Sequence, residues 1–531
     1  MEPLDPEISY RALQTRDPRF DGRLFVGVIS TGIYCRPICP ARTPKREHCR
    51  FFSSSAAAQA AGFRACLRCR PEIAPELPAW RGTSNTVSRA LALIADGFLD
   101  REDGTIEALA GRVGMGARQL RRLFDQHLGV APVVLAQSRR LLFAKQLLHE
   151  TSLPMTDVAI AGGFGSIRRF NHAFRALYHR SPRELRRATG ASTSHAVTAP
   201  VVLKIPYRPP YDWDSMLRYL QARAIDGLEV VEEGLYRRIV THEGLTGSVT
   251  IEHRPVSHCL LATICFPSVG ALQAIVSRIR HQFDVGADIE AIAGHLSKDE
   301  ALAPLVAARP GLRAPGCWDG FELAVRAVLG QQVTVAAARR LGAALVDLWG
   351  DPLLNREDRR LTRTFPTAGR LATADLTRLG MPSARRATIT ALAQAASANP
   401  TLFTPGGSID ERVAQLRVIP GIGAWTAEYI ALRAFREPDA FPVTDLGLLR
   451  GATHLIGAEN LEVTSLSKRA EAWRPWRAYA AQYLWTIHHR HCHTSTEIHH
   501  ATPTSPVHGN STDADRHPGR DLGRQRGLTR D

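Results

Sequence analysis

Four cysteines near the N-terminus constrain the fold of this chain more than any other feature. Cys35 and Cys39 are separated by three residues, and Cys66 and Cys69 by two. Two such loops present four sulfurs to one ion, as in a tetrahedral zinc site. The alternative is a disulfide framework, but residues 1–10 are polar and resemble no secretory signal. We therefore predict one Zn²⁺ on these cysteines in a cytoplasmic, bacterial protein, with Cys49 outside the site.

The residues around these cysteines resemble the N-terminal metal domain of the Ada regulators. The likeness rests on residues 24–37 and 61–69, which place arginines directly beside the cysteines. It implies that a zinc-bound cysteine accepts a methyl group from a methylphosphotriester in DNA, and that Cys35 is the acceptor. Zinc-bound thiols are deprotonated, and the thiolate is the nucleophile. Transfer removes one negative charge, which predicts tighter DNA binding. A structural zinc without transfer is the alternative.

The charge of the whole chain favours a polyanionic partner. Lysine and arginine number 67 against 51 aspartates and glutamates, a formal net charge of +16 over 531 residues. Such an excess is typical of proteins that bind nucleic acid or an anionic membrane, although part of it is also expected on any arginine-rich surface. The sequence has no apolar run long enough to cross a bilayer. Double-stranded DNA is therefore the predicted partner, without a membrane.

Changes in composition divide the chain into segments. Residues 71–85 are rich in proline, residues 189–200 in small polar side chains, and residues from 488 onward in histidine, threonine, serine and arginine. The first two stretches are typical of linkers, and the last of a disordered tail. The expected domains cover residues 1–75, 85–187, 200–310 and 311–487, with the tail at residues 488–531.

The second segment carries two helix-turn-helix patterns. Residues 105–116 predict a helix capped by Thr105 and a glycine-containing turn, and residues 117–124 predict the next helix. A second copy covers residues 154–174. Arginine and glutamine on such a helix read base edges in a major groove. The predicted DNA contacts are Arg118, Gln119, Arg121, Arg122, Ser166, Arg168, Arg169 and Asn171.

This tandem resembles the DNA-binding domain of AraC-type regulators, through residues 161–166 and 169–174 in particular. The resemblance implies that the two units bind successive major grooves of a promoter. It also implies RNA polymerase as a partner, and we expect a monomer. The alternative is a plain helical bundle with a basic surface.

The third segment contains a helix-hairpin-helix pattern and a single carboxylate. Residues 419–427 include the hairpin glycines Gly421 and Gly423, and residues 441–447 place Asp445 after a proline-led loop. The glycines allow a tight turn that exposes backbone N–H groups to a DNA phosphate, without sequence preference. These residues alone also fit a phosphate clamp without catalysis, with Asp445 as the N-cap of the next helix.

The pattern resembles the helix-hairpin-helix DNA glycosylases, and the AlkA-type 3-methyladenine glycosylases most closely. Residues 206–213, 309–317, 327–333 and 473–480 extend the likeness over residues 200–485. It implies that Asp445 is the catalytic carboxylate. It also implies a base pocket formed by Trp425, Tyr429, Trp485 and Gln331.

The same resemblance implies two further features. Gln332 falls where the family has an apolar wedge that fills the space left by a flipped base, so the chain departs from the family there. The resemblance also implies that the hairpin holds a monovalent cation at Arg417, Ile419 and Gly421. Because lysine is missing at the position used for Schiff-base chemistry, we expect a monofunctional enzyme rather than a lyase.

Together these features predict a multidomain α+β protein. A small Cys₄ zinc domain precedes an all-α tandem helix-turn-helix domain, a mixed α/β subdomain and an all-α helix-hairpin-helix glycosylase domain. The expected function is a response to DNA alkylation that combines methyl transfer, promoter binding and removal of bases such as 3-methyladenine. The alternatives are a transcription factor whose C-terminal domain only binds damaged DNA, and a structural zinc domain that only recruits the glycosylase. A Pro-Cys-His-Arg motif is missing, so repair of O6-methylguanine is not expected.

Overall fold

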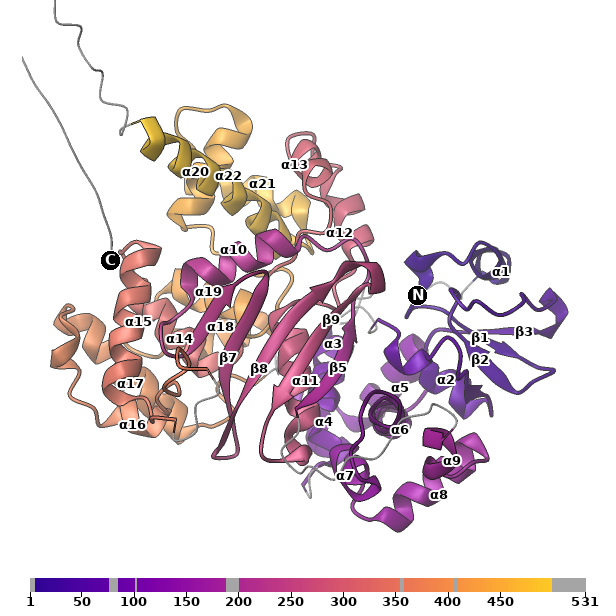
Figure 1. Ribbon diagram of the computed structural model, residues 1–531. Helices are drawn as coiled ribbons and strands as arrows, with labels where there is room; N and C mark the ends of the chain where they lie inside the picture. The colour runs from indigo at the N-terminus through magenta and orange to yellow at the C-terminus, as the bar shows by residue number, and fades with distance from the viewer. Residues whose placement is uncertain are drawn as a thin grey trace, which may run out of the picture. The chain divides into compact units, whose positions relative to one another are not determined.

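Four domains follow one another along the chain, and they have the fold class that the sequence predicts (Figure 1). The computed structural model describes residues 5–75, 85–100, 103–187, 200–353, 358–404 and 408–498. Most of both predicted linkers, and residues 499–531 of the predicted tail, lie outside these ranges. Contacts divide the chain into two units, Met1–His488 and His489–Asp531, and the four domains lie in the first. Among the described residues, no helix has the length and apolar character needed to span a membrane.

The first domain is built on a four-stranded sheet. Its strands are β1 (Phe25–Val28), β2 (Ile33–Cys35), β3 (Cys49–Phe52) and β4 (Arg64–Ala65), in the order β3-β1-β2-β4. Helices α1 (Pro6–Gln14) and α2 (Ser55–Ala60) complete the domain. β1 pairs antiparallel with β2 and β3, whereas β2 and β4 run parallel. The residues that end β2 and follow β4 therefore meet at one edge of the sheet.

The second domain consists of two helix-turn-helix units that share one long helix. Its helices are α3 (Asn85–Ala95), α4 (Ile106–Arg112), α5 (Ala117–Leu128), α6 (Pro132–Glu150), α7 (Met155–Ala161), α8 (Ile167–Tyr178) and α9 (Pro182–Arg187). Thr105 caps α4 as predicted, accepting a hydrogen bond from Ala108 N at 3.0 Å. Leu135 of α6 packs in the core of the first unit, and Leu147 in that of the second. α6 therefore supports both units.

The third domain is a five-stranded antiparallel sheet with helices on one face. Its strands are β5 (Val201–Pro206), β6 (Glu229–Glu232), β7 (Leu235–His242), β8 (Leu245–Arg254) and β9 (Cys259–Cys265), in the order β5-β9-β8-β7-β6. Buried and exposed residues alternate along β5, because successive side chains point to opposite faces. Helices α10 (Trp213–Arg223) and α11 (Leu272–Gln282) share the buried core of this sheet.

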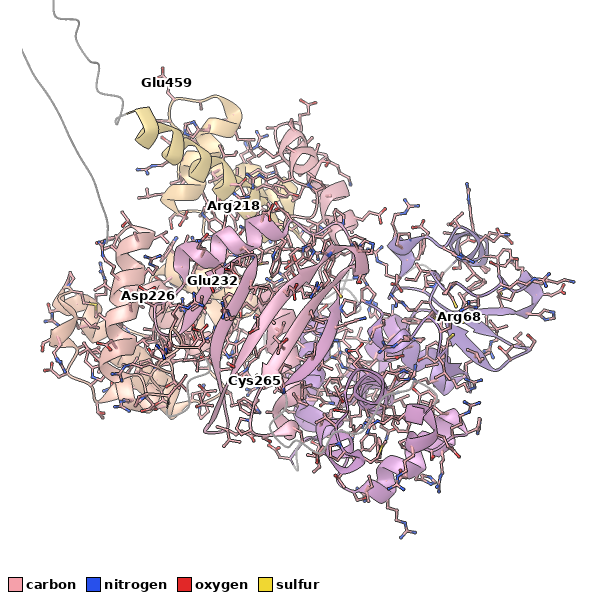
Figure 2. The ribbon with its side chains drawn as sticks, viewed as in Figure 1. Arg68, Arg218, Asp226, Glu232, Cys265 and Glu459 are labelled. Atoms are coloured by element: carbon pink, nitrogen blue, oxygen red, sulfur yellow. The ribbon has the colours of Figure 1, made fainter. Side chains whose placement is uncertain are left out.

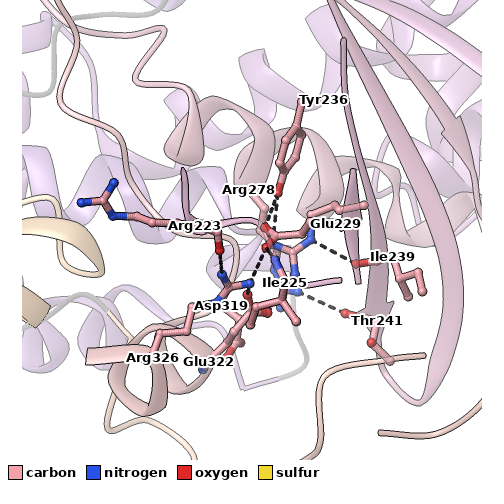
Figure 3. A network of polar contacts seen from close by, with 11 residues as sticks. Arg223, Ile225, Glu229, Tyr236, Ile239, Thr241, Arg278, Asp319, Glu322 and Arg326 are labelled. Atoms are coloured by element: carbon pink, nitrogen blue, oxygen red, sulfur yellow. Dashed lines mark hydrogen bonds and ion pairs between the residues drawn. The ribbon is translucent and has the colours of Figure 1, made fainter. Parts of the chain in front are cut away.

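A buried network of ion pairs joins this sheet to helix α14 (Gly320–Leu329) of the next domain (Figure 3). Arg238 contacts Glu322 at 2.8 Å, and Arg326 contacts both Glu322 and Glu229 at 2.6 Å. Tyr236 donates a hydrogen bond to Glu229 at 2.7 Å. Two guanidinium groups thus balance two carboxylates, which is the condition under which charges can be buried.

The fourth domain is helical, and it includes two helices from the segment expected in the third domain (residues 200–310), because their buried residues pack in its core. Its other helices are α12 (Ile289–Leu296), α13 (Ala303–Ala308), α15 (Val335–Trp349), α16 (Ala368–Ala372), α17 (Ser383–Ala398), α18 (Ile409–Arg417), α19 (Ala424–Arg433), α20 (Leu446–Ile456), α21 (Val463–Ala470) and α22 (Arg477–Ile498). The hairpin lies between α18 and α19. The sequence suggested a tail from residue 488 onward, but α22 continues to Ile498. Tyr483 and Leu484 are buried and anchor the helix, and extending a helix that is already formed is easier than starting one.

Candidate functional site

The four predicted zinc ligands come together at one edge of the first sheet. The parallel register of β2 and β4 places Cys35 and Cys66 side by side. Their Sγ atoms and those of Cys39 and Cys69 all lie within 4.8 Å of one another. Sulfurs bound tetrahedrally to zinc at about 2.3 Å are about 3.8 Å apart, so the cluster fits a zinc ion. Cys35 is partly exposed, whereas the other three cysteines are buried.

The four sulfurs share hydrogen bonds with one another and accept two from the backbone. Arg36 N donates to Cys69 Sγ and Arg68 N to Cys66 Sγ, each at 3.3 Å. Hydrogen bonds among the four cysteines lower the pKa of the Cys66 and Cys39 thiols and raise the pKa of Cys35 and Cys69. Because thiolates are the form that binds a metal, a bound ion is needed to hold all four sulfurs ionised.

The arginines beside the cysteines have different surroundings. The Arg36 side chain is buried, pairs with Asp21 and donates to Cys69 O at 3.1 Å. Arg68 is exposed, and Figure 2 shows it in the cysteine-rich domain. Cys49 lies outside the cluster, as predicted. Arg36 therefore fixes the loop that carries the cysteines, and Arg68 is available to an approaching polyanion.

A buried ion pair, which the sequence did not reveal, connects the cluster to α6. Lys145 Nζ contacts Glu72 Oε2 at 2.5 Å, and both side chains are 0% exposed. Lys145 also donates to the carbonyl oxygen of Cys66 at 3.3 Å. Burial acts to raise the pKa of Glu72, but Lys145 and Arg70 together outweigh it and the pKa is lowered. One lysine therefore links a metal ligand to the helix that supports both helix-turn-helix units.

The predicted DNA-contact residues of the first unit share one exposed face of α5. Arg118, Gln119, Arg121 and Arg122 are all exposed, while Leu120 is buried beneath them. Arg121 also pairs with a glutamate of α4 at 3.0 Å, so it needs to leave that partner before it can contact DNA. The arrangement matches a recognition helix, and the individual base contacts stay predictions.

The second unit presents a similar face on α8. Arg168 and Arg169 are exposed, whereas Asn171 is half-buried. Ser166 caps α8, since its hydroxyl accepts from Arg169 N at 3.2 Å. This capping role is sufficient to explain Ser166, and contact with DNA is an additional prediction for it.

The hairpin between α18 and α19 depends on one glycine more than on the other. Gly421 has φ +84°, and a Cβ atom there would lie 1.8 Å from Thr388 Oγ1. Gly423 is the N-cap of α19, and a Cβ atom there would meet nothing within 4 Å. Only Gly421 therefore requires glycine on structural grounds, because both its backbone and its neighbour exclude a side chain.

Two of the three carbonyl groups predicted to hold a monovalent cation already take part in hydrogen bonds. Ile419 O accepts from Ile422 N at 3.1 Å, and Gly421 O accepts from Gln331 Nε2 at 3.1 Å. A carbonyl oxygen has two lone pairs, so these bonds neither require nor exclude an ion. The cation stays a prediction.

Asp445 lies half-buried at the N-terminus of α20, held by three N–H groups. Trp425 Nε1 donates to its Oδ2 at 2.8 Å, and Trp485 Nε1 donates to its Oδ1 at 2.9 Å. Leu448 N also donates to Oδ1, at 2.9 Å. The carboxylate is thus the N-cap that the sequence offered as an alternative. It is also fixed against two aromatic residues of the predicted pocket, and the helix N-terminus favours its negative charge.

The predicted pocket aromatics gather around this carboxylate. The rings of Trp425 and Tyr429 are stacked, 5.4 Å apart and inclined by 14°. Trp485 meets Tyr429 edge to face at 6.5 Å. Because Trp425 and Tyr429 contact each other directly, a base has to stack on the remaining ring faces rather than between these two.

Gln331 and Gln332 occupy the turn before α15. Gln331 Nε2 donates to Gly421 O and to Thr426 Oγ1, at 3.1 and 3.0 Å. Its own carbonyl accepts from Arg385 at 2.6 Å. Gln331 therefore braces the hairpin. Gln332 is exposed and has φ +57°, so it projects from a turn that its neighbour holds in place.

The sequence analysis missed two residues that pack behind the pocket. Tyr219 of α10 lies with its hydroxyl 3.3 Å from that of Tyr429. The Arg433 guanidinium lies 5.6 Å from the ring centroid of Tyr429 and 5.0 Å from that of Trp485. Residues 425, 429 and 433 are spaced by four, which puts them on one face of a helix, so this spacing was a usable signal for Arg433. Tyr219 comes from another domain and had no such signal.

Comparison with known families matches three parts of the chain. Residues 9–72 match the metal binding domain of Ada, residues 109–188 a helix-turn-helix domain, and residues 202–319 the AlkA N-terminal domain. The solved 3-methyladenine DNA glycosylase from Archaeoglobus fulgidus covers 54% of this chain and 98% of its own, at 22% identity and a TM-score of 0.49. The three family matches and the two sites define an Ada-type regulator joined to an AlkA-type domain.

Relatives extend this conclusion to the whole chain. A probable bifunctional transcriptional activator/DNA repair enzyme AlkA from Mycobacterium tuberculosis is 41% identical over 486 residues, which are 91% of this chain and 96% of that protein. DNA-3-methyladenine glycosylase 2 from Escherichia coli is 36% identical over 52% of this chain and 95% of its own length. The Escherichia coli activator and repair enzyme Ada is 35% identical over 30% of this chain and 43% of its own. The chain belongs to the family of fused Ada and AlkA proteins represented by the mycobacterial relative.

Proposed function

We propose that this chain regulates transcription in response to DNA alkylation and excises alkylated bases from double-stranded DNA. The observation that carries the enzymatic part is Asp445, whose two carboxylate oxygens are held by the indole N–H groups of Trp425 and Trp485. A carboxylate fixed at the edge of an aromatic surface suits a reaction in which a flat base stacks and its sugar becomes positively charged.

Base excision follows from this arrangement. A purine alkylated at N3 or N7 is cationic and stacks favourably on aromatic rings. When its bond to C1′ breaks, the bonding electrons move onto the base, which leaves neutral, and positive charge develops on the sugar. Asp445 stabilises that charge. A water oxygen then adds to C1′ and loses a proton, which leaves an abasic site and makes the enzyme a monofunctional DNA-3-methyladenine glycosylase.

The test is release of free bases from methylated duplex DNA. Asp445→Asn keeps the shape and the N-cap but removes the charge, and we expect it to lower release of 3-methyladenine by at least a hundredfold, or about 3 kcal/mol. Asp439→Asn is the matched control, because that carboxylate pairs with Arg474 and Arg477 at the surface. Unchanged release in Asp445→Asn contradicts the assignment. No release from the wild-type chain favours a C-terminal domain that only binds damaged DNA.

Methyl transfer is the second proposed activity, and the partial exposure of Cys35 supports it, since the other three cysteines of the cluster are buried. Cys35 Sγ attacks the methyl carbon of a methylphosphotriester. A C–S bond forms, the C–O bond breaks, and its electron pair restores the negative charge of the phosphate. A bound Zn²⁺ keeps the four thiols ionised. The cluster then carries one negative charge fewer, which favours promoter binding by α5 and α8. RNA polymerase as a partner, and the monomeric state, belong to this proposal.

The intact mass of the protein tests the methyl acceptor. After incubation with an oligonucleotide that carries one methylphosphotriester, we expect a gain of one methyl group in the wild type and in Cys49→Ala. Cys35→Ala should gain none while it still binds zinc. A methylated Cys35→Ala protein would assign the acceptor to another residue, and an unmethylated wild type would leave a structural zinc site.

A further inference from the structure

Arg433, at the C-terminal end of α19, is a buried cation packed against the outer side of the aromatic pocket. It is 1% exposed. Its Cζ atom lies 4.8 Å from the ring centroid of Tyr219, 5.0 Å from that of Trp485 and 5.6 Å from that of Tyr429. Two of these rings, Tyr429 and Trp485, belong to the proposed base pocket. The guanidinium therefore packs against two of the rings proposed to receive a base.

The charge of Arg433 is not cancelled by a carboxylate. Its Nη1 donates to Pro315 O at 2.8 Å and its Nη2 to Gln482 Oε1 at 3.0 Å, and both partners are neutral. No ion pair to Arg433 occurs among the described residues, and its Nε has no hydrogen-bond partner there. Arg238, by contrast, meets Glu322 at 2.8 Å. Buried charge that is not neutralised is costly, so its field persists in the pocket.

The pKa of Tyr429 responds to this field. Burial acts to raise the pKa of its hydroxyl, yet the charge of Arg433, followed by that of Arg223 and by hydrogen bonds with Tyr219 and Arg433, outweighs burial, and the pKa is lowered. The pocket wall therefore favours negative charge. This preference is unexpected for a pocket that receives a cationic base, because a cation behind the rings opposes the attraction between the base and the ring faces.

The chemistry of excision resolves the conflict. During cleavage one electron pair moves from the C1′–N bond onto the base, so the base becomes more negative by one charge whether it starts cationic or neutral. A positive charge behind the base favours that movement, and a negative charge beside the sugar favours it from the other end. Interactions that strengthen only as the bond breaks accelerate the reaction, whereas equal stabilisation of both states does not.

We propose that Arg433, acting through the rings of Tyr429 and Trp485, opposes Asp445 across the glycosidic bond and draws the bonding electrons onto the departing base. The inference rests on the proposed glycosylase activity. Arg433 does not touch the substrate, so it is a positioning residue. Trp485 joins the two ends, since its ring face meets Arg433 and its N–H group meets Asp445. The same field assists removal of neutral damaged purines, which leave with negative charge.

The test compares single-turnover excision with binding, for duplex DNA containing either cationic 7-methylguanine or neutral hypoxanthine. Arg433→Met should lower the excision rate about tenfold to a hundredfold on both DNAs. In the Asp445→Asn background, where cleavage is suppressed, Arg433→Met should tighten binding of the 7-methylguanine DNA several-fold and leave that of the hypoxanthine DNA unchanged. Arg433→Lys keeps the positive charge but loses the planar set of guanidinium N–H donors, and it should retain most of the excision rate.

Two controls separate the field from a structural role. Gln482→Ala removes a hydrogen-bond partner of Arg433 and leaves its charge, so its rate should stay within about threefold of the wild type. Arg223→Met removes the more exposed cation, 4.1 Å from the Tyr219 ring, and should have the smaller effect. The proposal is overturned if Arg433→Lys and Gln482→Ala are as slow as Arg433→Met, or if Arg433→Met weakens binding of both DNAs alike. Failure of the wild type to release either base overturns the glycosylase assignment and this inference with it.

Discussion

The cysteine cluster and the aromatic pocket stabilise negative charge by different means. The cluster gathers four sulfurs within 4.8 Å of one another, and a metal ion is needed to hold them as thiolates. The pocket holds one carboxylate, and its support comes from neutral N–H groups of Trp425, Trp485 and Leu448. One site therefore depends on a bound ion, whereas the other is complete in its own side chains.

This difference agrees with the two proposed reactions. A methylphosphotriester reacts only with a strong nucleophile, and the acceptor sulfur is consumed when it is methylated. An alkylated base is already a good leaving group, so the pocket needs to stabilise charge without forming a bond, and it can act repeatedly. The two sites should therefore fail independently, through metal loss in one case and through changes in side-chain packing in the other.

The largest expected effect is that of removing zinc. Structural zinc contributes on the order of 10 kcal/mol to the folding of small domains, and without it the four sulfurs lose the bonds that hold them together. Chelation, or Cys69→Ser, should unfold the first domain and abolish methyl uptake, while base release changes by less than about twofold. Circular dichroism, zinc content and base release on the same samples provide the measurement, with Cys49→Ser as the matched control. A parallel loss of base release would show that the two sites are not independent.

The second prediction concerns the buried pair between Lys145 and Glu72. Lys145→Met removes one of two cations that pair with the buried carboxylate of Glu72, the other being Arg70 at 3.0 Å, and should lower the free energy of unfolding by about 1–3 kcal/mol. The pKa of Glu72 is lowered in the folded protein, so the pair stabilises the fold above the usual glutamate pKa. This stabilisation should disappear as the pH falls through the lowered value.

Urea unfolding of the wild type and of Lys145→Met across acidic pH provides the measurement. The difference between them should be full near neutrality and should shrink below the usual glutamate pKa. A difference that does not change with pH would mean that Lys145 acts through packing rather than through its charge.

The third prediction concerns a packing change in the hairpin beside the aromatic pocket. Gly421→Ala introduces a Cβ atom 1.8 Å from Thr388 Oγ1 at a residue with φ +84°, and should cost about 2–4 kcal/mol. Base release and affinity for DNA should fall, while methyl uptake by the cluster is retained. Gly423→Ala is the matched control, since a Cβ atom there has open space. Equal melting temperatures for the two variants would contradict the geometry of the hairpin.

The smallest expected effect is that of Gln332. Gln332→Leu restores an apolar wedge and should tighten binding to a duplex with an abasic-site analogue by about fivefold, equivalent to about 1 kcal/mol. Affinity for an undamaged duplex is the control and should not change. Equal shifts on both duplexes would indicate a general contact with DNA instead of insertion at the damaged step.

Local patterns predicted the parts of these sites that are close in sequence. The cysteine spacing and the hairpin glycines identified a metal cluster and a tight turn, because each depends on a few consecutive residues. Tertiary contacts decided the rest. Lys145 and Tyr219 reach their partners from other domains, and no spacing connects them to Cys66 or Tyr429. Ser166 was predicted to contact DNA, but its position at a helix start gives it a capping role as well.

The most direct test of the account is a partition experiment with DNA that carries radiolabelled methyl groups on both phosphates and bases. The wild-type chain should retain at most one labelled methyl group per molecule and release labelled bases over many turnovers. Cys35→Ala should lose only the label on the protein, and Asp445→Asn should lose only the released bases. If either single variant abolishes both signals, or if label persists on Cys35→Ala, the two-site account is contradicted.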